Sequence, residues 1–246
     1  MNCVLDLDGT VVFAEPAEIP IPGRSRCSYL STATADWLKR IGAVSNLYIA
    51  SARSAASVAG LVRALPQVRF AGFVLEGGLV CRADIFSPPK PAPAQVELAE
   101  KIASTYPDWD VVAGYEEMIC CVAPSHIDAL PIVQQIASSH PSTSRWISHR
   151  ERHKTFLYPA PLCKLAGLQR LGVEEIDFAA GDDEVYDQSL LASAKRCYTL
   201  QSAAPSIIEL VQQRRGTLST HTSHRGAAEI LAHIHRELIV VDRESE

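Results

Sequence analysis

Short apolar runs alternate with helix-like stretches at both ends of this 246-residue chain. Runs that are apolar throughout are typical of strands buried on both faces of a parallel sheet, and apolar residues at helical spacing predict the helices between them. We expect strands at residues 3–7, 47–50, 73–75, 176–180 and 196–200, and helices at 32–41, 54–65, 164–171, 188–194, 206–215 and 227–237. Repeated strand–helix units predict an α/β fold with a Rossmann-like, doubly wound parallel sheet.

A proline-rich stretch at residues 87–93 interrupts this alternation and marks a boundary. Beyond it the expected order is helix, two strands, helix and two strands, at 94–105, 109–113, 118–123, 127–139, 144–148 and 155–158. This order predicts a small inserted α+β domain with an antiparallel sheet. We therefore expect a core made of residues 1–84 and 159–246 and an inserted domain at residues 85–158.

The composition is that of an ordinary globular chain, with 47% hydrophobic and 21% charged residues. A net charge of −5 gives no reason to expect nucleic acid or an anionic membrane as a partner, and no apolar run is long enough to span a bilayer. The first expected strand begins near residue 2, which leaves no room for a signal peptide. Seven cysteines without a CxxC pair indicate neither a zinc ribbon nor a redox motif, so we expect a cytoplasmic protein. We expect a monomer or a homodimer.

The first apolar run ends in two aspartates, Asp6 and Asp8, followed at once by Gly9 and Thr10. A strand that ends there brings two carboxylates together at the mouth of a loop. Like charges so close are unfavourable unless a cation or a shared proton relieves them. The sequence therefore favours a Mg²⁺ or acid/base role, and the alternative is a plain turn after a buried strand.

Polar groups also follow the other expected core strands, and ligands of open α/β sheets bind beyond the carboxyl ends of the strands. Ser51 and Arg53 offer a hydroxyl and a guanidinium suited to phosphate oxygens. The third strand leads into Glu-Gly-Gly at residues 76–78, and Lys164 stands where the chain re-enters the core. The fourth strand is followed by three aspartates, which are Asp182, Asp183 and Asp187. Together these groups suit one phosphate and one divalent cation.

This ordered set resembles the haloacid dehalogenase superfamily of aspartate-nucleophile phosphatases. DLDGT at residues 6–10 is similar to its first motif, Ser51 to its second, Lys164 to its third, and the Asp182 to Asp187 spacing to its fourth. An insertion between the second and third motifs resembles the subgroup with the large α/β cap. That subgroup includes trehalose-phosphate, sucrose-phosphate and mannosyl-3-phosphoglycerate phosphatases as well as phosphomannomutase.

The resemblance implies a role for each matched residue. Asp6 would attack phosphorus and form an aspartyl-phosphate, while Asp8 would protonate the leaving group and then activate water. Lys164 and Ser51 would hold the phosphate oxygens, where charge develops in the transition state. Mg²⁺ would be bound by Asp6, the Asp8 carbonyl and Asp182. Thr10 and Arg53 are further candidates for phosphate or substrate binding, and Asp183 and Asp187 for the metal.

Several of these residues have simpler alternatives. Lys164 could be a solvated residue in the first turn of a helix, and Arg53 could pair with a nearby carboxylate. Asp183 and Asp187 could each cap the following helix, although the spacing favours a role beside the metal for Asp187. The basic stretch at residues 149–154 could be a solvated turn or a substrate contact, and Arg24 and Arg26 could contact substrate.

The sequence thus predicts a Mg²⁺-dependent phosphatase for a small phosphorylated metabolite, with a sugar phosphate suggested by family analogy. A sugar phosphomutase and a non-catalytic sugar-phosphate-binding protein remain alternatives. Kinase and dehydrogenase interpretations lack a GxxxxGK[ST] or GxGxxG sequence.

Overall fold

The structure is a computed structural model that describes residues 1–23, 27–151 and 153–244. The chain divides into two compact units. The core unit comprises Met1–Arg53, Ser57–Ile85 and Cys163–Glu246, and the inserted unit comprises Ser54–Ala56 and Phe86–Leu162. The α/β fold class expected from the sequence is confirmed.

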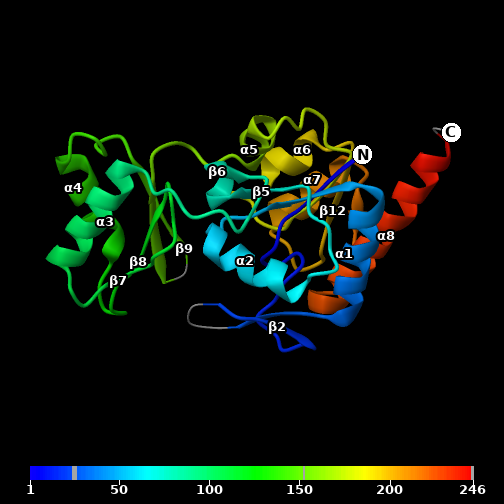
Figure 1. Cartoon of the computed structure of the whole chain (residues 1–246), viewed down its shortest axis with the longest axis horizontal. Helices are drawn as coiled ribbons and strands as arrows, with labels where there is room; N and C mark the ends of the chain where they lie inside the picture. Colours follow the sequence, from blue (N-terminus) through cyan, green and yellow to red (C-terminus); the bar gives the residue numbers. More distant parts are fainter. Residues whose placement is uncertain (24–26, 152, 245–246) are drawn as a thin grey trace. The chain divides into compact units, whose positions relative to one another are not determined.

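A seven-stranded sheet forms the centre of the core unit (Figure 1). Its strands, in spatial order, are β13 (Thr217–Leu218), β12 (Arg196–Thr199), β11 (Phe178–Ala180), β1 (Asn2–Leu5), β4 (Asn46–Ala50), β5 (Gly72–Leu75) and β6 (Val80–Arg82). The strands from β13 to β5 pair in parallel, and β6 pairs with β5 antiparallel. Strands β5 and β11 are buried along their whole length, because helices cover both faces of the sheet.

Helices flank this sheet on both faces. They are α1 (Thr32–Val44), α2 (Ala55–Ala64), α5 (Lys164–Arg170), α6 (Gln188–Ser193), α7 (Pro205–Gln213) and α8 (Ser223–Glu244). One apolar cluster joins α5, α6 and α7 to the sheet through side chains such as Leu168, Leu190 and Ile207. Helix α1 packs against α8 and β4 and is capped by Ser31, whose hydroxyl accepts the Thr34 N–H at 3.1 Å. The burial of these apolar side chains stabilises the layers.

Four short features of the core were not expected from the sequence. They are the hairpin of β2 (Ile19–Ile21) and β3 (Ser28–Leu30), the strands β6 and β13, and the 3₁₀ turn η1 (Glu76–Gly78). Each of these strands, and the 3₁₀ turn, has only two or three residues, which is too short for a periodic pattern to appear.

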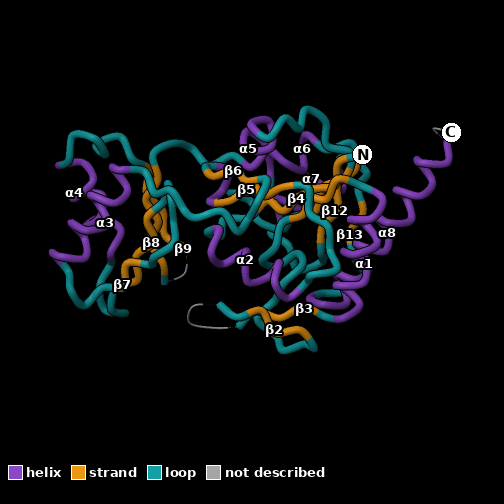
Figure 2. Tube along the Cα trace, viewed as in Figure 1, coloured by secondary structure: helices purple, strands orange, loops and turns teal. Residues whose placement is uncertain are grey.

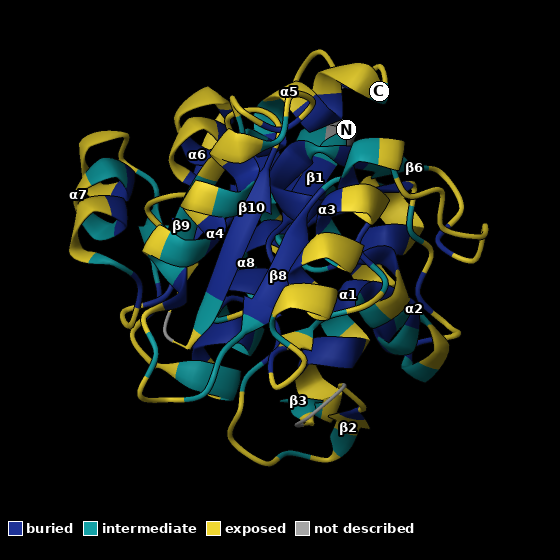
Figure 3. Ribbon diagram, turned by 90° about the vertical axis from the view of Figure 1, so that its left-hand side faces the viewer, coloured by how far each residue is buried: buried dark blue, intermediate teal, exposed yellow. Residues whose placement is uncertain are grey.

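The inserted unit is a four-stranded antiparallel sheet with two helices (Figure 2). The sheet order is β7 (Asp110–Val111), β8 (Ile119–Val122), β10 (Lys154–Tyr158) and β9 (Ile147–Glu151), and the helices are α3 (Pro93–Thr105) and α4 (Ala129–Ser139). Leu98, Val133 and Leu157 belong to its apolar cluster, and Figure 3 shows β8 and β10 largely buried. Residues 149–151, for which a solvated turn and a substrate contact were both considered, belong to β9 and pair with β10, while residue 152 lies outside the described residues.

None of the helices in the described ranges is long and apolar enough to cross a membrane.

Candidate active site

The candidate site lies at the carboxyl edge of the core sheet, where β11, β1, β4 and β5 are neighbours. Asp6 directly follows β1, and its N–H still donates to the Ala180 carbonyl of β11 at 2.9 Å. Asp182 comes two residues after β11, and Ser51 directly follows β4. Parallel pairing therefore gathers three polar side chains that are far apart in the sequence.

Lys164 binds two carboxylates inside the protein. Its Nζ donates to Asp6 Oδ1 and to Asp187 Oδ1, each at 2.5 Å. The Lys164 side chain is 1% exposed, and those of Asp6 and Asp187 are 7% and 0% exposed. Burial lowers the pKa of Lys164, but the charges of Asp187 and Asp6 outweigh it and raise that pKa above its ordinary value. Lys164 is a buried cation, so the alternative of a solvated lysine is wrong.

Asp6, Asp182 and Asp187 form a carboxylate cluster, with one oxygen from each lying within 4.8 Å of the others. Burial raises the pKa of Asp182 to about 7, and the Asp187 charge adds to this effect. The pKa of Asp6 is also raised, first by burial and then by the neighbouring carboxylates, against the opposing effect of Lys164. Three carboxylates share one buried ammonium, which leaves an excess of negative charge that protons or a cation must balance.

The donor chemistry of the carboxylate cluster fits a hard divalent cation. Mg²⁺ prefers oxygen ligands and is commonly held by one or two carboxylates together with water. Asp187 already uses Oδ1 for Lys164 and Oδ2 for the N–H groups of Asp182 and Asp183, both at 3.1 Å. Asp6 and Asp182 carry fewer hydrogen bonds, so they are better placed to offer oxygens to a metal.

The loop that follows Asp6 packs closely against the Asp182 side chain. Gly9 has φ +79°, and a Cβ at this position would lie 2.0 Å from Asp182 Oδ2. Only glycine combines this backbone conformation with so close an approach. The Thr10 hydroxyl, fully buried, donates to Asp182 Oδ1 at 3.2 Å. In this structure Thr10 therefore binds a carboxylate of the cluster through its hydroxyl.

Asp8 is not a member of the carboxylate cluster and is ion-paired with Arg53. Arg53 Nε and Nη2 donate to its two oxygens at 2.7 and 2.6 Å, and the Asp8 side chain is 61% exposed. The Ser28 hydroxyl accepts a further bond from Arg53 Nη2 at 2.8 Å. Of the two interpretations of Arg53, pairing with a carboxylate is the one seen here.

The remaining sequence candidates have local partners. The buried Ser51 hydroxyl accepts the Arg53 N–H at 3.2 Å. Asp183 Oδ1 accepts the N–H groups of Val185 and Tyr186 at 2.7 and 3.2 Å, which lie in the turn before α6 and not in the helix, so Asp183 stabilises this turn and is not the N-cap of α6. Asp187 stands at the N-cap position of α6 but makes no capping bond with its side chain. Arg24 and Arg26 lie outside the described residues.

Two residues near the site were given no role from the sequence. Glu76 is fully buried after β5 with φ +51°, and the N–H groups of Glu76 and Gly77 donate to the carbonyls of Arg53 and Ser51, both at 3.1 Å. A non-glycine residue in this backbone region is uncommon and often marks a functional loop. The Tyr186 ring lies 5.9 Å from Lys164 Nζ. Glu76 could have been proposed as a site residue because it is a charged residue at the end of a strand. Nothing in the sequence marked Tyr186.

Comparison with known proteins finds relatives among solved structures. No protein-family model and no curated protein matches the sequence. A haloacid dehalogenase-like hydrolase from Bacteroides thetaiotaomicron is 16% identical, with TM-score 0.69 over 95% of this chain and 98% of the other. A protein related to trehalose-6-phosphate phosphatase is 14% identical, with TM-score 0.62 over 99% and 100%. A HAD subclass IIB sugar phosphatase is 12% identical, with TM-score 0.59 over 95% and 98%.

These likenesses cover nearly the whole of each chain, at identities that show the fold alone. The chain therefore has the fold of the haloacid dehalogenase-like hydrolases, and the resemblance predicted from its motifs is confirmed at that level.

Proposed function

We propose that this chain is a Mg²⁺-dependent phosphomonoester hydrolase that acts through an aspartyl-phosphate on Asp6. The observation that carries the proposal is Lys164, fixed between Asp6 and Asp187 with Asp182 in the same carboxylate cluster. A structural ion pair needs one acid for each base, whereas this site gathers three acids around one lysine, two of them buried and the third, Asp182, partly buried. Such an excess is useful where a cation and a phosphoryl group must be bound together.

The metal would be held by Asp6, Asp182 and the Asp8 carbonyl. It would neutralise the repulsion between a phosphate dianion and an approaching carboxylate. Lys164 orients Asp6 by binding Oδ1, which leaves Oδ2 as the oxygen that attacks phosphorus. Attack forms the Asp6–phosphorus bond as the bond from phosphorus to the substrate oxygen breaks.

Asp8 would supply the proton that the departing alkoxide needs and would later take a proton from the water that hydrolyses the aspartyl-phosphate. Because both Asp8 oxygens are bound by Arg53 in this structure, that ion pair has to open before the carboxyl can reach the substrate. The freed guanidinium would then be able to bind a phosphate oxygen. Ser51 would offer its hydroxyl to the same phosphate.

We propose a small phosphorylated sugar as the substrate class and a substrate-selecting cap role for residues 85–158. Support comes from the neighbours, which include a subclass IIB sugar phosphatase and a protein related to trehalose-6-phosphate phosphatase. An inserted unit with its own sheet and apolar cluster is also consistent with a separate selecting domain.

The test is release of inorganic phosphate from an aryl phosphate with Mg²⁺, followed by a panel of phosphorylated sugars. We expect Asp6→Asn to lower the turnover number by at least about 10³-fold, as removal of a nucleophile does. Asp177→Asn is the matched control, because Asp177 immediately precedes β11, at the sheet edge opposite Asp182. Turnover that survives in Asp6→Asn would refute the mechanism. Transfer of the phosphoryl group to a second sugar without phosphate release would refute the hydrolase assignment.

A further inference from the structure

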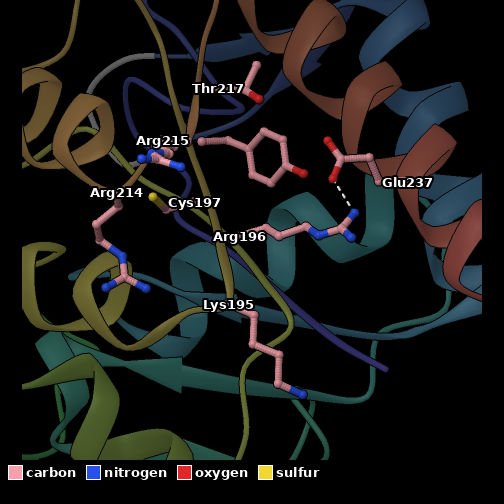
Figure 4. Close-up of a pocket in the computed structure, with 9 residues that line it drawn as sticks. Lys195, Arg196, Cys197, Arg214, Arg215, Thr217 and Glu237 are labelled. Carbon is pink, nitrogen blue, oxygen red and sulfur yellow. Dashed lines mark hydrogen bonds and ion pairs between the residues drawn. The ribbon is translucent and has the colours of Figure 1, made fainter.

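A second concentration of charge lies in the core unit, away from the candidate active site. It surrounds a cavity of about 170 Å³ at the start of β12 and β13, which is the amino edge of these parallel strands (Figure 4). We call it the basic pocket, and the charged residues that line it are Lys195, Arg196, Arg214, Arg215 and Glu237. Four of the chain's 23 lysines and arginines therefore line one cavity of a protein with net charge −5.

Three of the four cations already have partners. Lys195 Nζ binds Glu175 and Asp177 at 2.7 and 2.9 Å. The Arg196 guanidinium is turned toward the Glu237 carboxylate and donates to it (Figure 4). Arg214 Nη2 donates to the Ala194 carbonyl at 2.6 Å.

Arg215 differs from the other three. Its guanidinium forms no hydrogen bond or ion pair with any residue in the described ranges. Its backbone has φ +56°, at the end of α7, where glycine is usual. Residues held in this conformation cluster at ligand-binding sites, where the surrounding structure sustains the strain.

The wall of the basic pocket also holds a buried hydroxyl. Tyr198 is 1% exposed, and its hydroxyl lies beside the Glu237 carboxylate. Burial, followed by the charge of Glu237 and a hydrogen bond to it, raises the pKa of Tyr198, so the hydroxyl keeps its proton. Tyr198 and Arg196 therefore share Glu237 as an acceptor, and an anion in the cavity would supply a second one.

We propose that the basic pocket is a binding site for a small oxyanion of the phosphate type, separate from the candidate active site. Arg215 supplies the free guanidinium, Arg196 a second one, and Tyr198 a hydroxyl. The cavity is smaller than the roughly 300–1,000 Å³ of pockets that take drug-sized ligands, which fits a compact anion. Arginine suits this role because its planar fork matches the spacing of phosphate oxygens. The assignment is independent of the proposed reaction, since it uses none of its residues.

The test is a titration of the full chain with inorganic phosphate, followed by backbone amide NMR shifts in buffer free of divalent cations. We expect saturable shifts at residues 195–198 and 214–217, with Kd on the order of 1 mM or tighter. Arg215→Gln should weaken this binding about tenfold or more, because a charge-assisted contact is lost. Arg225→Gln, at an exposed arginine of α8 outside the basic pocket, should leave it unchanged. Wild-type affinity in Arg215→Gln, or saturable shifts confined to the residues around Asp6, would overturn the proposal.

A second variant separates binding from folding. Arg215→Gly relieves the positive φ and should raise Tm by about 2–4 °C while removing phosphate binding. Retention of phosphate affinity in this more stable variant would refute the role of Arg215. Glycerol phosphate and orthophosphate are then compared, and the tighter ligand shows whether the site takes a phosphorylated small molecule or the free ion. Equal affinity for chloride would overturn the assignment to an oxyanion.

Discussion

Replacement of Lys164 by methionine should be among the most destabilising single changes in the core unit. The substitution keeps much of the side-chain volume but removes the cation that pairs with two buried carboxylates, each bound at 2.5 Å. Loss of one partner of a buried ion pair costs about 3–5 kcal/mol, because the remaining charge is left without compensation.

Protonation sets an upper limit on this penalty. A carboxylate with an ordinary pKa of 3.8 can take up a proton at pH 7 at a cost of about 4 kcal/mol, and at pH 5 the cost is only about 1.6 kcal/mol. We therefore expect Lys164→Met to lower the free energy of unfolding by about 3–4 kcal/mol at pH 7 and by roughly half as much at pH 5.

The assay is urea denaturation in buffer free of divalent cations, followed by circular dichroism at both pH values. With a slope of about 2–3 kcal/mol/M, the midpoint should fall by about 1–2 M at pH 7. Lys195→Met is the matched control, because Lys195 also binds two carboxylates but is more than half exposed. Its midpoint should hardly change, since surface ion pairs contribute little. Equal shifts in the two variants, or a Lys164→Met effect that is the same at pH 5 and pH 7, would refute this reasoning.

Three further predictions follow from the geometry of the site. Gly9→Ala should reduce phosphate release more than tenfold, because its Cβ would displace Asp182, whereas Gly172→Ala, with the same φ of +79° and no atom within 4 Å, should retain activity. Without divalent cations, the free energy of unfolding should fall as pH rises from about 4 to 7. The reason is that Asp182 has a pKa of about 7 in the folded chain, so it keeps a proton there that it has already released in the unfolded chain. Asp182→Asn should therefore make the free energy of unfolding depend less on pH over this range. Mg²⁺ at 100 times its Kd should raise Tm by about 5–10 °C in the wild type and much less in Asp182→Asn, as measured by thermal unfolding.

The sequence predicted best those candidate site residues that come directly after a strand. Asp6, Ser51 and Asp182 follow buried apolar runs, and parallel pairing leaves little freedom in where such residues meet. Burial of Lys164 was harder to foresee, because a lysine in the first turn of a helix is usually solvated. Its position depends on Gly78, where a Cβ would lie 2.1 Å from the Cys163 carbonyl.

Features set by loop conformation could not be predicted from the sequence. Pairing of Arg53 with some nearby carboxylate was one alternative, but the choice of Asp8 as partner depends on side-chain rotamers, and the hairpin that brings Ser28 to Arg53 has strands of three residues each. The basic pocket depends on a left-handed Arg215, a conformation for which a sequence pattern would favour glycine.

The division of the chain has a consequence for how such a protein could change over time. The carboxylate cluster and Lys164 all come from the core unit, whose segments leave at Ile85 and resume at Cys163. Under the proposed function, a different insert between these two points would keep the charges proposed to act on phosphorus and would change only the proposed substrate-selecting unit. One reactive centre could in this way be reused for new metabolites by exchanging a single continuous stretch of the gene.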